Sequence, residues 1–446
     1  METLLGSSTS PAETGSLPEH GRTPDTVLEE LRELCRDDHD YAGGTVFNSI
    51  CSAPLDIARR VFAQHLDANM GDNRIFPSLR RAEADLSAML GELLGHPGAV
   101  GVTTSGGTEA NLLVVLAAVR RYHDRAGGSG PARIVLPESA HFSFDKIVGM
   151  LPVEPVYAPL DDRLRVRPEE LTRLVTADTA LVVTTAGTSE AGAVDDVPAV
   201  AEHTAALGVP LHVDAATGGF LIPFARELGY DLPPFAFDVP GVTSVALDPH
   251  KYGGVPIPSG HLLLRDRADA ELLRTASHYR GTFDHHGLLG TRPGAAVLAA
   301  WAVLRTLGRS GYRELVKEVF TRRDLLIGML RDAGFTTAME PQLTVVTVRH
   351  PEPARLVDAL ERRGFIASVA RRYGLLRLVV HWHQTAEQLR GLVDAMTAAD
   401  DPWEGEGRES AVRLRQQAQV LPAGAAHRHG HRGHPGAYRR TRGRGA

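Results

Sequence analysis

The chain has 446 residues, of which two are cysteine, with 43% hydrophobic and 23% charged residues and a net charge of −6. These values are typical of a globular protein with room for a large domain and a smaller one. Two cysteines exclude a disulfide framework, and the lack of any run of about 18 apolar residues excludes a membrane span, so a cytoplasmic protein is expected.

Both ends of the chain are predicted to be disordered. Residues 1–26 are rich in Ser, Thr, Pro and Glu, and lack the basic start and apolar stretch of a secretory signal. Residues 401–446 form a tail rich in His and Arg without apolar periodicity.

The charge of the chain is unevenly distributed. Residues 427–446 hold six arginines and no acid, which leaves 42 basic against 54 acidic side chains elsewhere. This acidic body argues against nucleic acid as the main partner. A nucleic-acid binder that uses the tail is the open alternative, and its binding would be salt-sensitive and lost with the tail.

Residues 27–95 are predicted to form an N-terminal helical segment. Apolar residues recur at helical spacing from Val27 to Leu34. A loop over residues 69–77 interrupts the pattern, and residues 80–95 resume it.

Residues 96–310 are predicted to form a large α/β domain. Strands alternate with amphipathic stretches such as Val197–Leu207, which indicates a mostly parallel central sheet flanked by helices. The predicted strands are Arg133–Leu136, Ala180–Thr185, Pro210–Asp214, Thr243–Leu247 and His261–Leu264. In such a fold we expect functional residues in the loops at strand ends.

A small C-terminal α/β domain is predicted over residues 311–400, with a helical connection from Trp301 to Arg331 leading into it. Its predicted strands are Leu343–Val348, Phe365–Ala370 and Leu375–Val380, and its predicted helices are Pro353–Arg363 and Thr385–Ala398. The whole chain is therefore expected to be an α/β protein with two domains of unequal size.

A glycine-rich turn, Ser105-Gly-Gly-Thr108, precedes a stretch with apolar residues at helical spacing. A turn at a helix N-terminus offers free backbone N–H groups and the positive end of the helix dipole, which suits a phosphate. The turn matches neither the nucleotide P-loop nor the dinucleotide G-x-G-x-x-G pattern. Taken alone, it fits an ordinary capped helix start equally well.

Three further residues with useful chemistry follow predicted strands, in the order His141, Asp214, Lys251. An imidazole can stack on a cofactor ring and transfer a proton. A carboxylate in an apolar strand needs a cationic partner, such as a protonated pyridine nitrogen, and a lysine amine forms Schiff bases with carbonyl cofactors. One at a time, the three also fit a structural histidine, a turn-capping aspartate and a surface lysine. Their order along the chain is the stronger signal.

Seven blocks of sequence resemble the group II pyridoxal-phosphate (PLP) dependent decarboxylases, above all the branch of archaeal-type tyrosine/aspartate decarboxylases. The blocks are Ser105–Asn111, His141–Lys146, Gly187–Gly192, His212–Ala216, Asp248–Lys251, Gly290–Gly294 and Leu376–Val380. The resemblance runs from about residue 45 to about residue 398. It implies a fold type I PLP enzyme, with residues 96–310 as the PLP-binding domain, that works as a homodimer with shared active sites.

The resemblance also implies the catalytic residues. Lys251 would form the Schiff base with PLP, and Asp214 would pair with the pyridine nitrogen. His141 would stack on one face of the ring, and Ala216 would pack on the other.

The remaining implied contacts hold the phosphate and the substrate. The phosphate would be bound by Ser105, Gly106, Gly107 and Thr108, with His250 beside it. Thr188 would lie near the phenolic oxygen of the ring, and Arg377 would meet the α-carboxylate of the substrate. For Arg377, a structural ion pair with an acid of the small domain is the alternative.

The reaction implied by the resemblance is decarboxylation of an L-amino acid to the amine and CO₂. The segment from Ser277 to His286 departs from the family pattern, so the side chain of the substrate stays open. A PLP carbon–carbon lyase of the aldehyde-lyase type and a transaminase or oxidative deaminase on the same scaffold are the alternative enzymes. An inactive PLP-binding or scaffold protein would show a broken motif, and none is seen.

Four other residues stand out without a clear role. His381 and His383 are spaced like metal ligands at a strand end, but no third ligand accompanies them and PLP chemistry needs no metal, so no metal is expected. Tyr279 and Phe283 fit substrate contacts and loop packing equally well.

Overall fold

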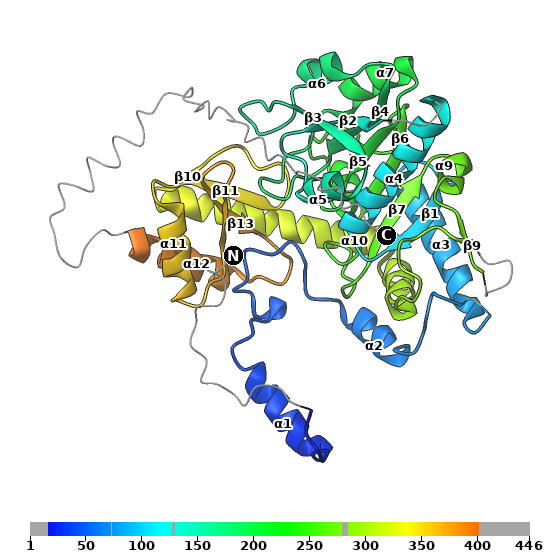
Figure 1. The fold of residues 1–446 in the computed structure, drawn as a ribbon. Helices are drawn as coiled ribbons and strands as arrows, with labels where there is room; N and C mark the ends of the chain where they lie inside the picture. The colour runs from blue at the N-terminus through cyan, green and yellow to red at the C-terminus, as the bar shows by residue number, and fades with distance from the viewer. Residues whose placement is uncertain (1–16, 73, 127–129, 279–283, 401–446) are drawn as a thin grey trace, which may run out of the picture.

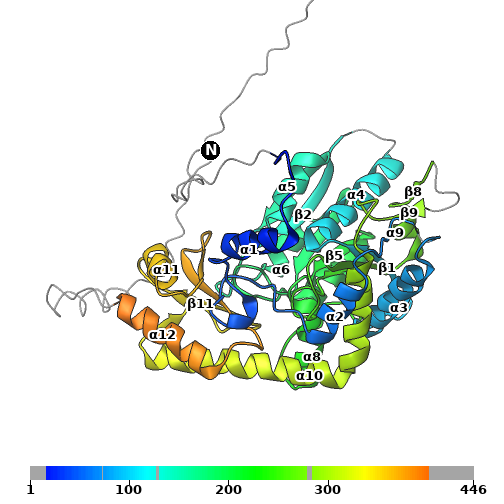
Figure 2. The ribbon, with the colours of Figure 1, turned by 90° about the horizontal axis from the view of Figure 1, so that it is seen from below.

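The computed structural model describes residues 17–72, 74–126, 130–278 and 284–400. The predicted disordered tail, most of the predicted disordered N-terminus, and the two aromatic residues Tyr279 and Phe283 lie outside these ranges. Within them, two α/β domains are arranged side by side, and a long helix extends beneath both (Figures 1 and 2).

The large domain is built on a seven-stranded sheet with the order β1-β7-β6-β5-β4-β2-β3. Only β7 runs in the opposite direction to the other six strands, so the prediction of a mostly parallel sheet is confirmed. The strands are β1 (Val100–Thr104), β2 (Ala132–Pro137), β3 (Val153–Ala158), β4 (Thr179–Thr185), β5 (Leu211–Asp214), β6 (Val242–Leu247) and β7 (Gly260–Leu264).

The alternation of side chains along the central strands creates two apolar layers. In β4, Val182 belongs to one core cluster, whereas its neighbours Leu181 and Val183 belong to the other. Successive residues of a strand point to opposite faces, so helices must cover both sides of this sheet. The helices are α3 (Pro77–Leu93), α4 (Gly107–Ala126), α5 (Ser143–Met150), α6 (Pro168–Leu174), α7 (Val197–Leu207), α8 (Ile222–Glu227) and α9 (Arg267–Glu271).

The ends of α7 show how local sequence sets a helix boundary. The side chain of Asp196 accepts a hydrogen bond from the N–H of Ala199, which satisfies a free amide of the first turn. Gly208 ends the helix in the left-handed region at φ 66°, where a side chain would be strained. The predicted helix over these residues is therefore confirmed with the same bounds.

The small domain is a four-stranded antiparallel sheet with the order β10-β11-β13-β12 and two helices packed on it. Its elements are β10 (Thr336–Thr337), β11 (Val345–Arg349), α11 (Pro353–Glu361), β12 (Ser368–Ala370), β13 (Leu375–Val379) and α12 (Ala386–Asp400). All three strands and both helices predicted here are present, although β12 begins three residues later than predicted.

The helix α10 (Gly294–Asp332) connects the two domains. It bends at Gly308, whose φ of 55° and ψ of −171° lie outside the helical region. The predicted domain boundary at residues 310–311 falls inside this helix, close to the bend.

The N-terminal segment contains α1 (Pro24–Leu34), the short 3₁₀ helix η1 (Tyr41–Gly43) and α2 (Asp56–Gln64). The helix α1 projects from the body and buries none of its residues (Figure 1). Between η1 and α2 the chain is extended and pairs with the small domain: the N–H of Phe47 donates to the carbonyl of Ile366, and the N–H of Val379 donates to the carbonyl of Phe47.

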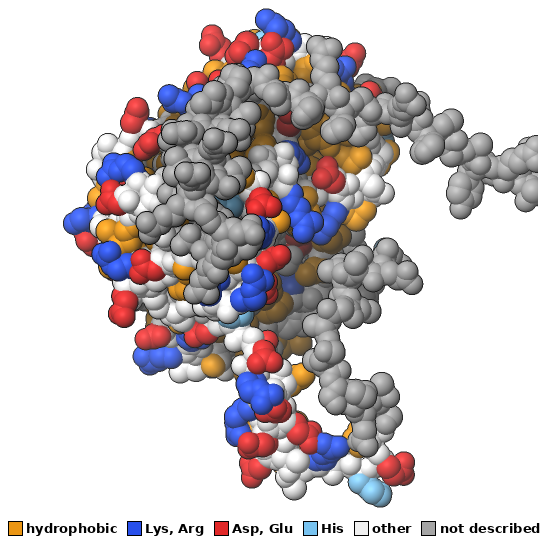
Figure 3. Space-filling view, turned by 90° about the vertical axis from the view of Figure 1, so that its left-hand side faces the viewer, with side chains coloured by type: hydrophobic (Ala, Val, Ile, Leu, Met, Phe, Trp, Pro, Cys, Tyr) orange, Lys and Arg blue, Asp and Glu red, His pale blue; other side chains and the backbone are white. Residues whose placement is uncertain are grey.

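Three minor elements complete the described chain: the 3₁₀ helix η2 (Gly218–Phe220) and the two-stranded sheet of β8 (Thr275–Ala276) and β9 (Asp284–His285). The face in Figure 3 carries basic and acidic side chains interspersed, without a large area of one sign. No helix in the described ranges is long and apolar enough to cross a membrane.

Candidate active site

A cavity of about 360 Å³ opens where the parallel strands β4 and β5 end. Thr185 and Asp214, the last residues of these two strands, lie in its wall, as expected for a sheet of this kind. Nine of the eleven predicted site residues line it, namely Ser105, Gly106, Gly107, Thr108, His141, Asp214, Ala216, His250 and Lys251. Segments far apart in the sequence are thus brought together as predicted.

The glycine-rich turn lies between β1 and α4. The carboxylate of Glu109 accepts the N–H of Ser105 at 2.7 Å, and this contact fixes the turn. In the part of the chain that the structure describes, the next three N–H groups, of Gly106, Gly107 and Thr108, have no protein acceptor. These are the free amides of a helix N-terminus, which suit an anion.

Glycine is required in this turn because the backbone approaches its neighbours closely. A Cβ atom on Gly107 would lie 3.1 Å from the Cβ of Ala216 and 3.2 Å from Oδ2 of Asp248. A Cβ atom on Gly106 would lie 3.0 Å from the ring of His250. A side chain here would therefore push into the cavity wall.

Asp214 is a buried carboxylate without a cationic partner among the described residues. Its Oδ1 accepts the N–H of Ala216 at 3.1 Å, and its Oδ2 accepts Nδ2 of Asn111 at 2.9 Å. Burial of a charge without an opposite charge is costly. A cation that enters the cavity would therefore be stabilised at this carboxylate.

Lys251 lies in the loop between β6 and β7, and its Nζ is 3.2 Å from Oδ2 of Asp248. Ser52 of the N-terminal segment donates to the carbonyl of Lys251 at 2.6 Å. On the other side, the hydroxyl of the buried Tyr252 donates to the carbonyl of Val380 in the small domain at 2.9 Å. The lysine is therefore held by contacts with both flanking parts of the chain.

Burial favours the neutral form of both histidines of the cavity. Burial lowers the pKa of His141 and the pKa of His250, and the positive charge of Lys251 contributes to both shifts. Nδ1 of His250 accepts the N–H of Ser259 at 3.2 Å, and Nδ1 of His141 accepts the N–H of Ser143 at 3.3 Å. Each ring consequently carries its proton on Nε2.

Two predicted site residues do not line the cavity. The hydroxyl of Thr188 accepts the N–H of Ala193 at 3.1 Å inside its own loop. Thr185 does line the cavity, and its buried hydroxyl has no partner in the described chain. The predicted position of Thr188 near the phenolic oxygen remains a prediction.

Arg377 lies on β13 of the small domain, beside the cavity rather than in its wall. Its Nε donates to the carbonyl of Ser189 at 2.6 Å, and its Nη1 donates to the carbonyl of Asn48 at 2.5 Å and to Oγ of Ser368 at 3.2 Å. No ion pair with an acid of the small domain is found among the described residues. Burial lowers the pKa of Arg377 to about 10, so the guanidinium stays charged near neutral pH.

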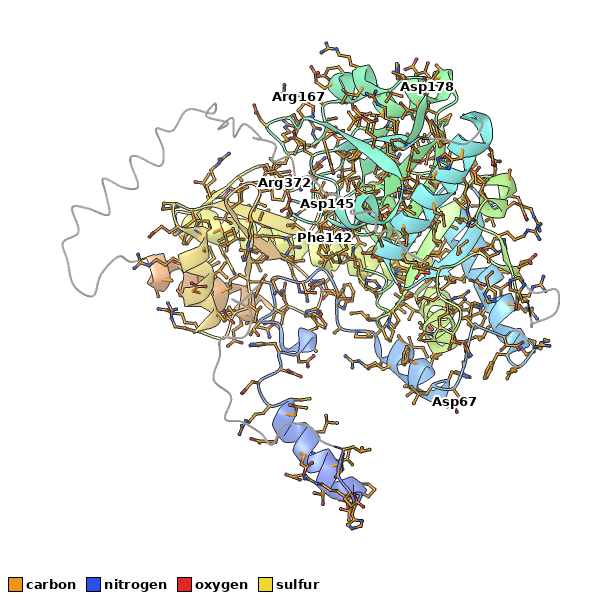
Figure 4. The ribbon with its side chains drawn as sticks, in the orientation of Figure 1. Asp67, Phe142, Asp145, Arg167, Asp178 and Arg372 are labelled. Atoms are coloured by element: carbon orange, nitrogen blue, oxygen red, sulfur yellow. The ribbon has the colours of Figure 1, made fainter. Side chains whose placement is uncertain are left out.

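Arg377 is not the only arginine near this boundary. Arg372, in the turn between β12 and β13, faces Phe142 and Asp145 of the large domain (Figure 4). It forms an exposed ion pair of 3.8 Å with Glu190, next to the cavity residue Ser189. The two domains thus meet beside the cavity.

His381 and His383 take part in a stack of aromatic rings rather than in a recognisable metal site. The ring of His381 lies between Tyr252, at 5.0 Å, and His383, at 5.1 Å, and its Nε2 donates to the carbonyl of Ser49. Among the described residues, no three His, Cys, Asp or Glu side chains are grouped to hold a metal ion.

Six residues of the cavity wall were not among the predicted site residues: Asn111, Thr185, Gly187, Ser189, Thr217 and Asp248. Asn111 is a polar residue on an otherwise apolar face of α4, and this break in the pattern is the signal that could have identified it. Thr185 ends a strand of buried residues, and Asp248 begins the loop that carries Lys251. No such signal separates these two from ordinary strand-end residues.

The free amides, the unpaired carboxylate and the amine fit PLP. The turn of Gly106 and Gly107 offers donors for a phosphate, and Asp214 offers the negative charge that a protonated pyridine nitrogen needs. Lys251 opens to the same cavity and supplies the amine for a covalent bond.

The chain matches a family model described as the pyridoxal-dependent decarboxylase conserved domain, over residues 39–350. The L-aspartate decarboxylase of Thermococcus kodakarensis is 39% identical over 375 residues, which cover 83% of this chain and 96% of the relative. A probable L-tyrosine/L-aspartate decarboxylase of Methanothermobacter thermautotrophicus is 38% identical over 355 residues, which cover 79% of this chain and 96% of the relative.

The fold also has close matches among solved structures. The sphingosine-1-phosphate lyase of Burkholderia pseudomallei superposes with a TM-score of 0.79 at 27% identity, over 92% of this chain and 97% of the other. The fold is thus shared with an enzyme named as a lyase of a different kind.

Proposed function

Because this chain belongs to the pyridoxal-dependent decarboxylase family and is a PLP-dependent amino-acid decarboxylase, we propose that its substrate is L-aspartate, which it converts to β-alanine and CO₂. The observation that carries this choice is the 39% identity over 375 residues with the L-aspartate decarboxylase of Thermococcus kodakarensis, because the residues of the cavity wall are assigned to the cofactor. The names of both curated relatives given above include aspartate.

The test is a panel of amino acids. The purified protein, supplied with PLP, is incubated with L-aspartate, L-glutamate and L-tyrosine, and CO₂ and the amine products are measured. We expect β-alanine as the main product. Tyramine without β-alanine would overturn the choice of substrate. Aldehyde products in a parallel incubation with a phosphorylated amino alcohol would instead favour the lyase that the solved structure suggests.

The proposed cofactor contacts follow the geometry of the cavity. Lys251 holds the cofactor through Nζ, and Asp214 pairs with the ring nitrogen. His141 and Ala216 line the same cavity and would enclose the ring from its two faces. The phosphate is bound at the helix N-terminus by Ser105, Gly106, Gly107 and Thr108, with His250 beside it, and Thr188 supports the loop near the phenolic oxygen.

When bound, PLP supplies an electron-poor ring that accepts the electron pair released as CO₂ leaves. The protein side chains orient the reacting groups and control the protons. Asp214 would stabilise positive charge at the ring nitrogen, because it is buried and pairs with no cationic side chain among the described residues. His141 is neutral and holds a proton on Nε2, so it can donate a hydrogen bond without adding charge.

We assign Arg377 to the α-carboxylate of the substrate. The carbonyls of Ser189 and Asn48 hold its Nε and Nη1, which leaves Nη2 without a partner in the described chain. Ser189 itself lines the cavity, so the guanidinium of Arg377 is bonded directly to a residue of the cavity wall. A single remaining donor suits orientation of a leaving carboxylate, because tight binding of that group would slow its departure.

We also propose a homodimer with shared active sites in the cytoplasm. The apolar residues Val27, Leu28, Leu31 and Leu34 of α1 are between 48% and 79% exposed, and Ile75 and Leu288 are exposed as well. Such a set of exposed apolar side chains is typical of a protein interface. The two cysteines are free, which agrees with a reducing compartment.

A further inference from the structure

A continuous chain of buried hydrogen bonds connects Asp214 to His141 behind the cavity. Nδ2 of Asn111 is 2.9 Å from Oδ2 of Asp214 and 3.1 Å from Oγ of Ser143. Oγ of Ser143 is 3.0 Å from Nδ1 of His141. On the far side, Oδ1 of Asn111 is 3.1 Å from Nε2 of His212. Asn111, Ser143 and His212 are fully buried.

The direction of every hydrogen bond in this chain is fixed by its neighbours. Nδ1 of His141 accepts the backbone N–H of Ser143, so it has no proton of its own. The hydroxyl of Ser143 therefore donates to His141 and accepts from Asn111. A carboxylate only accepts, so Asn111 also donates to Asp214. Both N–H bonds of the amide are thereby used, one on each acceptor.

The remaining end of the amide follows from the same logic. Since Nδ2 is turned to Asp214 and Ser143, Oδ1 of Asn111 faces His212 and accepts its Nε2–H. Nδ1 of His212 then accepts the hydroxyl of Ser244 at 2.9 Å. Burial lowers the pKa of His212 to about 4, so this ring is neutral. The amide separates a histidine from a carboxylate that would otherwise pair with it as an imidazolium.

We infer that Asn111 is a positioning residue whose one amide group orients the carboxylate of Asp214 and, through Ser143, the ring of His141. The same amide lies between His212 and Asp214 and keeps the two from forming an ion pair. A single side chain on the first turns of α4 thus fixes the acid for the ring nitrogen and the proton position of the imidazole. The helix α4 begins at the phosphate turn and also carries Asn111, so the turn and the amide belong to one rigid element. The inference rests on the proposed pairing of Asp214 with the cofactor.

The test compares four variants of the full-length protein: Asn111→Asp, Ser143→Ala, Asp214→Asn and the control Ser139→Ala. Ser139 is buried close to His141, and its hydroxyl has no partner in the described chain, so its removal should change little. Each variant is measured for PLP affinity by titration of the apoenzyme, for the absorption spectrum of the holoenzyme between pH 5 and 9, for kcat, and for thermal unfolding.

Asn111→Asp keeps the shape of the side chain but replaces a donor by a second carboxyl group beside Asp214. The two carboxyl groups would share one proton at low pH and repel each other once it is lost. We expect PLP affinity to fall by about 10- to 100-fold, the range for a lost buried hydrogen bond to a charge. We also expect the absorption spectrum and kcat to become pH-dependent, with kcat falling as pH rises through a range where the parent protein is flat.

Ser143→Ala removes only the hydroxyl that joins Asn111 to His141. We expect kcat to fall by about 10-fold, with PLP affinity equal to that of Ser139→Ala. The midpoint of thermal unfolding should lie below that of Ser139→Ala, because the change leaves a buried N–H of Asn111 without its acceptor. This variant keeps the inference testable if Asn111→Asp does not fold.

The outcomes distinguish the role of Asn111 from the proposed pairing of Asp214 with the cofactor. If Asp214→Asn binds PLP with an unchanged spectrum, the proposed role of Asp214 fails. If Asp214→Asn loses PLP affinity but Asn111→Asp behaves like the control at every pH, only the role of Asn111 fails. A kcat of Ser143→Ala equal to that of Ser139→Ala overturns the connection to His141.

Discussion

At the scale of single residues, the lysine of the cavity is distinguished by its surroundings. Lys251 is largely buried and 3.2 Å from Asp248, whereas the nearby Lys146 lies over the exposed ring of Phe142 on the surface. An amine that opens to an enclosed polar cavity is accessible to a carbonyl cofactor and shielded from other reactions. This contrast gives the first prediction.

Borohydride reduction of the yellow holoenzyme should fix PLP on the peptide that contains Lys251. The measurement is mass spectrometry of the digested protein. Lys251→Ala should lose the label, and Lys146→Ala should keep it. A label found on Lys146 or Lys317 would contradict the assignment.

A second prediction at this scale concerns the guanidinium on β13. Arg377→Lys keeps the positive charge but loses the planar fork that the carbonyls of Ser189 and Asn48 hold in place. KM for the amino acid should rise by roughly 10-fold and kcat should fall, because a charged hydrogen bond to the carboxylate is weakened. The absorbance of the bound cofactor should stay unchanged.

Arg372→Lys provides the matched control, since its ion pair with Glu190 is exposed and contributes little. If Arg377→Lys instead binds PLP poorly and unfolds early while its remaining holoenzyme turns over normally, Arg377 has a structural role only.

At the scale of helices, the bend of α10 depends on one glycine. Gly308 has φ 55° and ψ −171°, a combination that residues with a Cβ atom avoid. Gly308→Ala should lower the free energy of unfolding by about 1–3 kcal/mol, measured by urea titration. Gly328→Ala in the same helix is the control: a Cβ there meets nothing within 4 Å, and the change should stabilise by roughly 0.5–1 kcal/mol. Equal effects of the two changes would show that the bend carries no strain.

Three buried histidines give a prediction about pH. Burial lowers the pKa of His212 to about 4 and the pKa values of His261 and His381 to about 3, from an ordinary value of 6.5. Between these values the unfolded chain binds more protons than the folded one, so stability is lost as pH falls below 6.5. Each histidine contributes a slope of about 1.4 kcal/mol per pH unit.

Asp195 acts in the opposite direction, because burial raises its pKa to about 6 and its contribution decreases as pH rises from about 4 to 6. Three histidines outweigh one carboxyl group, so the free energy of unfolding of the apoenzyme should rise with pH from 4.5 to 6.5. His261→Gln should reduce the slope by about one bound proton. A slope independent of His261 would contradict the assignment.

The central strands could be predicted from sequence because each is a short, mostly apolar and almost wholly buried run. The five predicted strands of the large sheet are all present, whereas the edge strand β3 was missed: Pro155 and partly exposed residues interrupt its pattern. The strand β1 was missed because Gly101 divides it. A strand at an edge buries fewer residues and leaves a weaker pattern.

The candidate site could be predicted where a residue type is itself the signal. Lysine, aspartate and histidine at strand ends were recognisable, but the amide of Asn111 gains its meaning only from Asp214 and Ser143, which are 103 and 32 positions away. The sequence does not distinguish Thr185 from Thr188, because both are threonines at the end of the same apolar run. Only the folded loop decides that one hydroxyl faces the cavity and the other is used by Ala193.

For the whole molecule, the exposed apolar face of α1 leads to a prediction about assembly. The double change Leu28→Glu and Leu31→Glu should raise the dimer dissociation constant by at least about 10-fold, as measured by sedimentation. Leu207→Glu, at the exposed end of α7, is the control. A fully active monomer of the parent protein would refute the proposed homodimer.

The extended stretch between η1 and α2 has a consequence for the order in which the molecule is completed. Asn48 holds Arg377, Ser49 holds His381, and Ser52 holds Lys251. The contact between Asn48 and Arg377 spans 329 positions. During synthesis it can therefore form only after β13 has been made. A nascent chain that has emerged only through the large domain contains Lys251 and Asp214. It still lacks the contact that the small domain makes with Tyr252, next to the lysine. Stable loading of the cofactor is therefore a late event in biosynthesis, reached only after β13 has emerged and closed onto the N-terminal stretch.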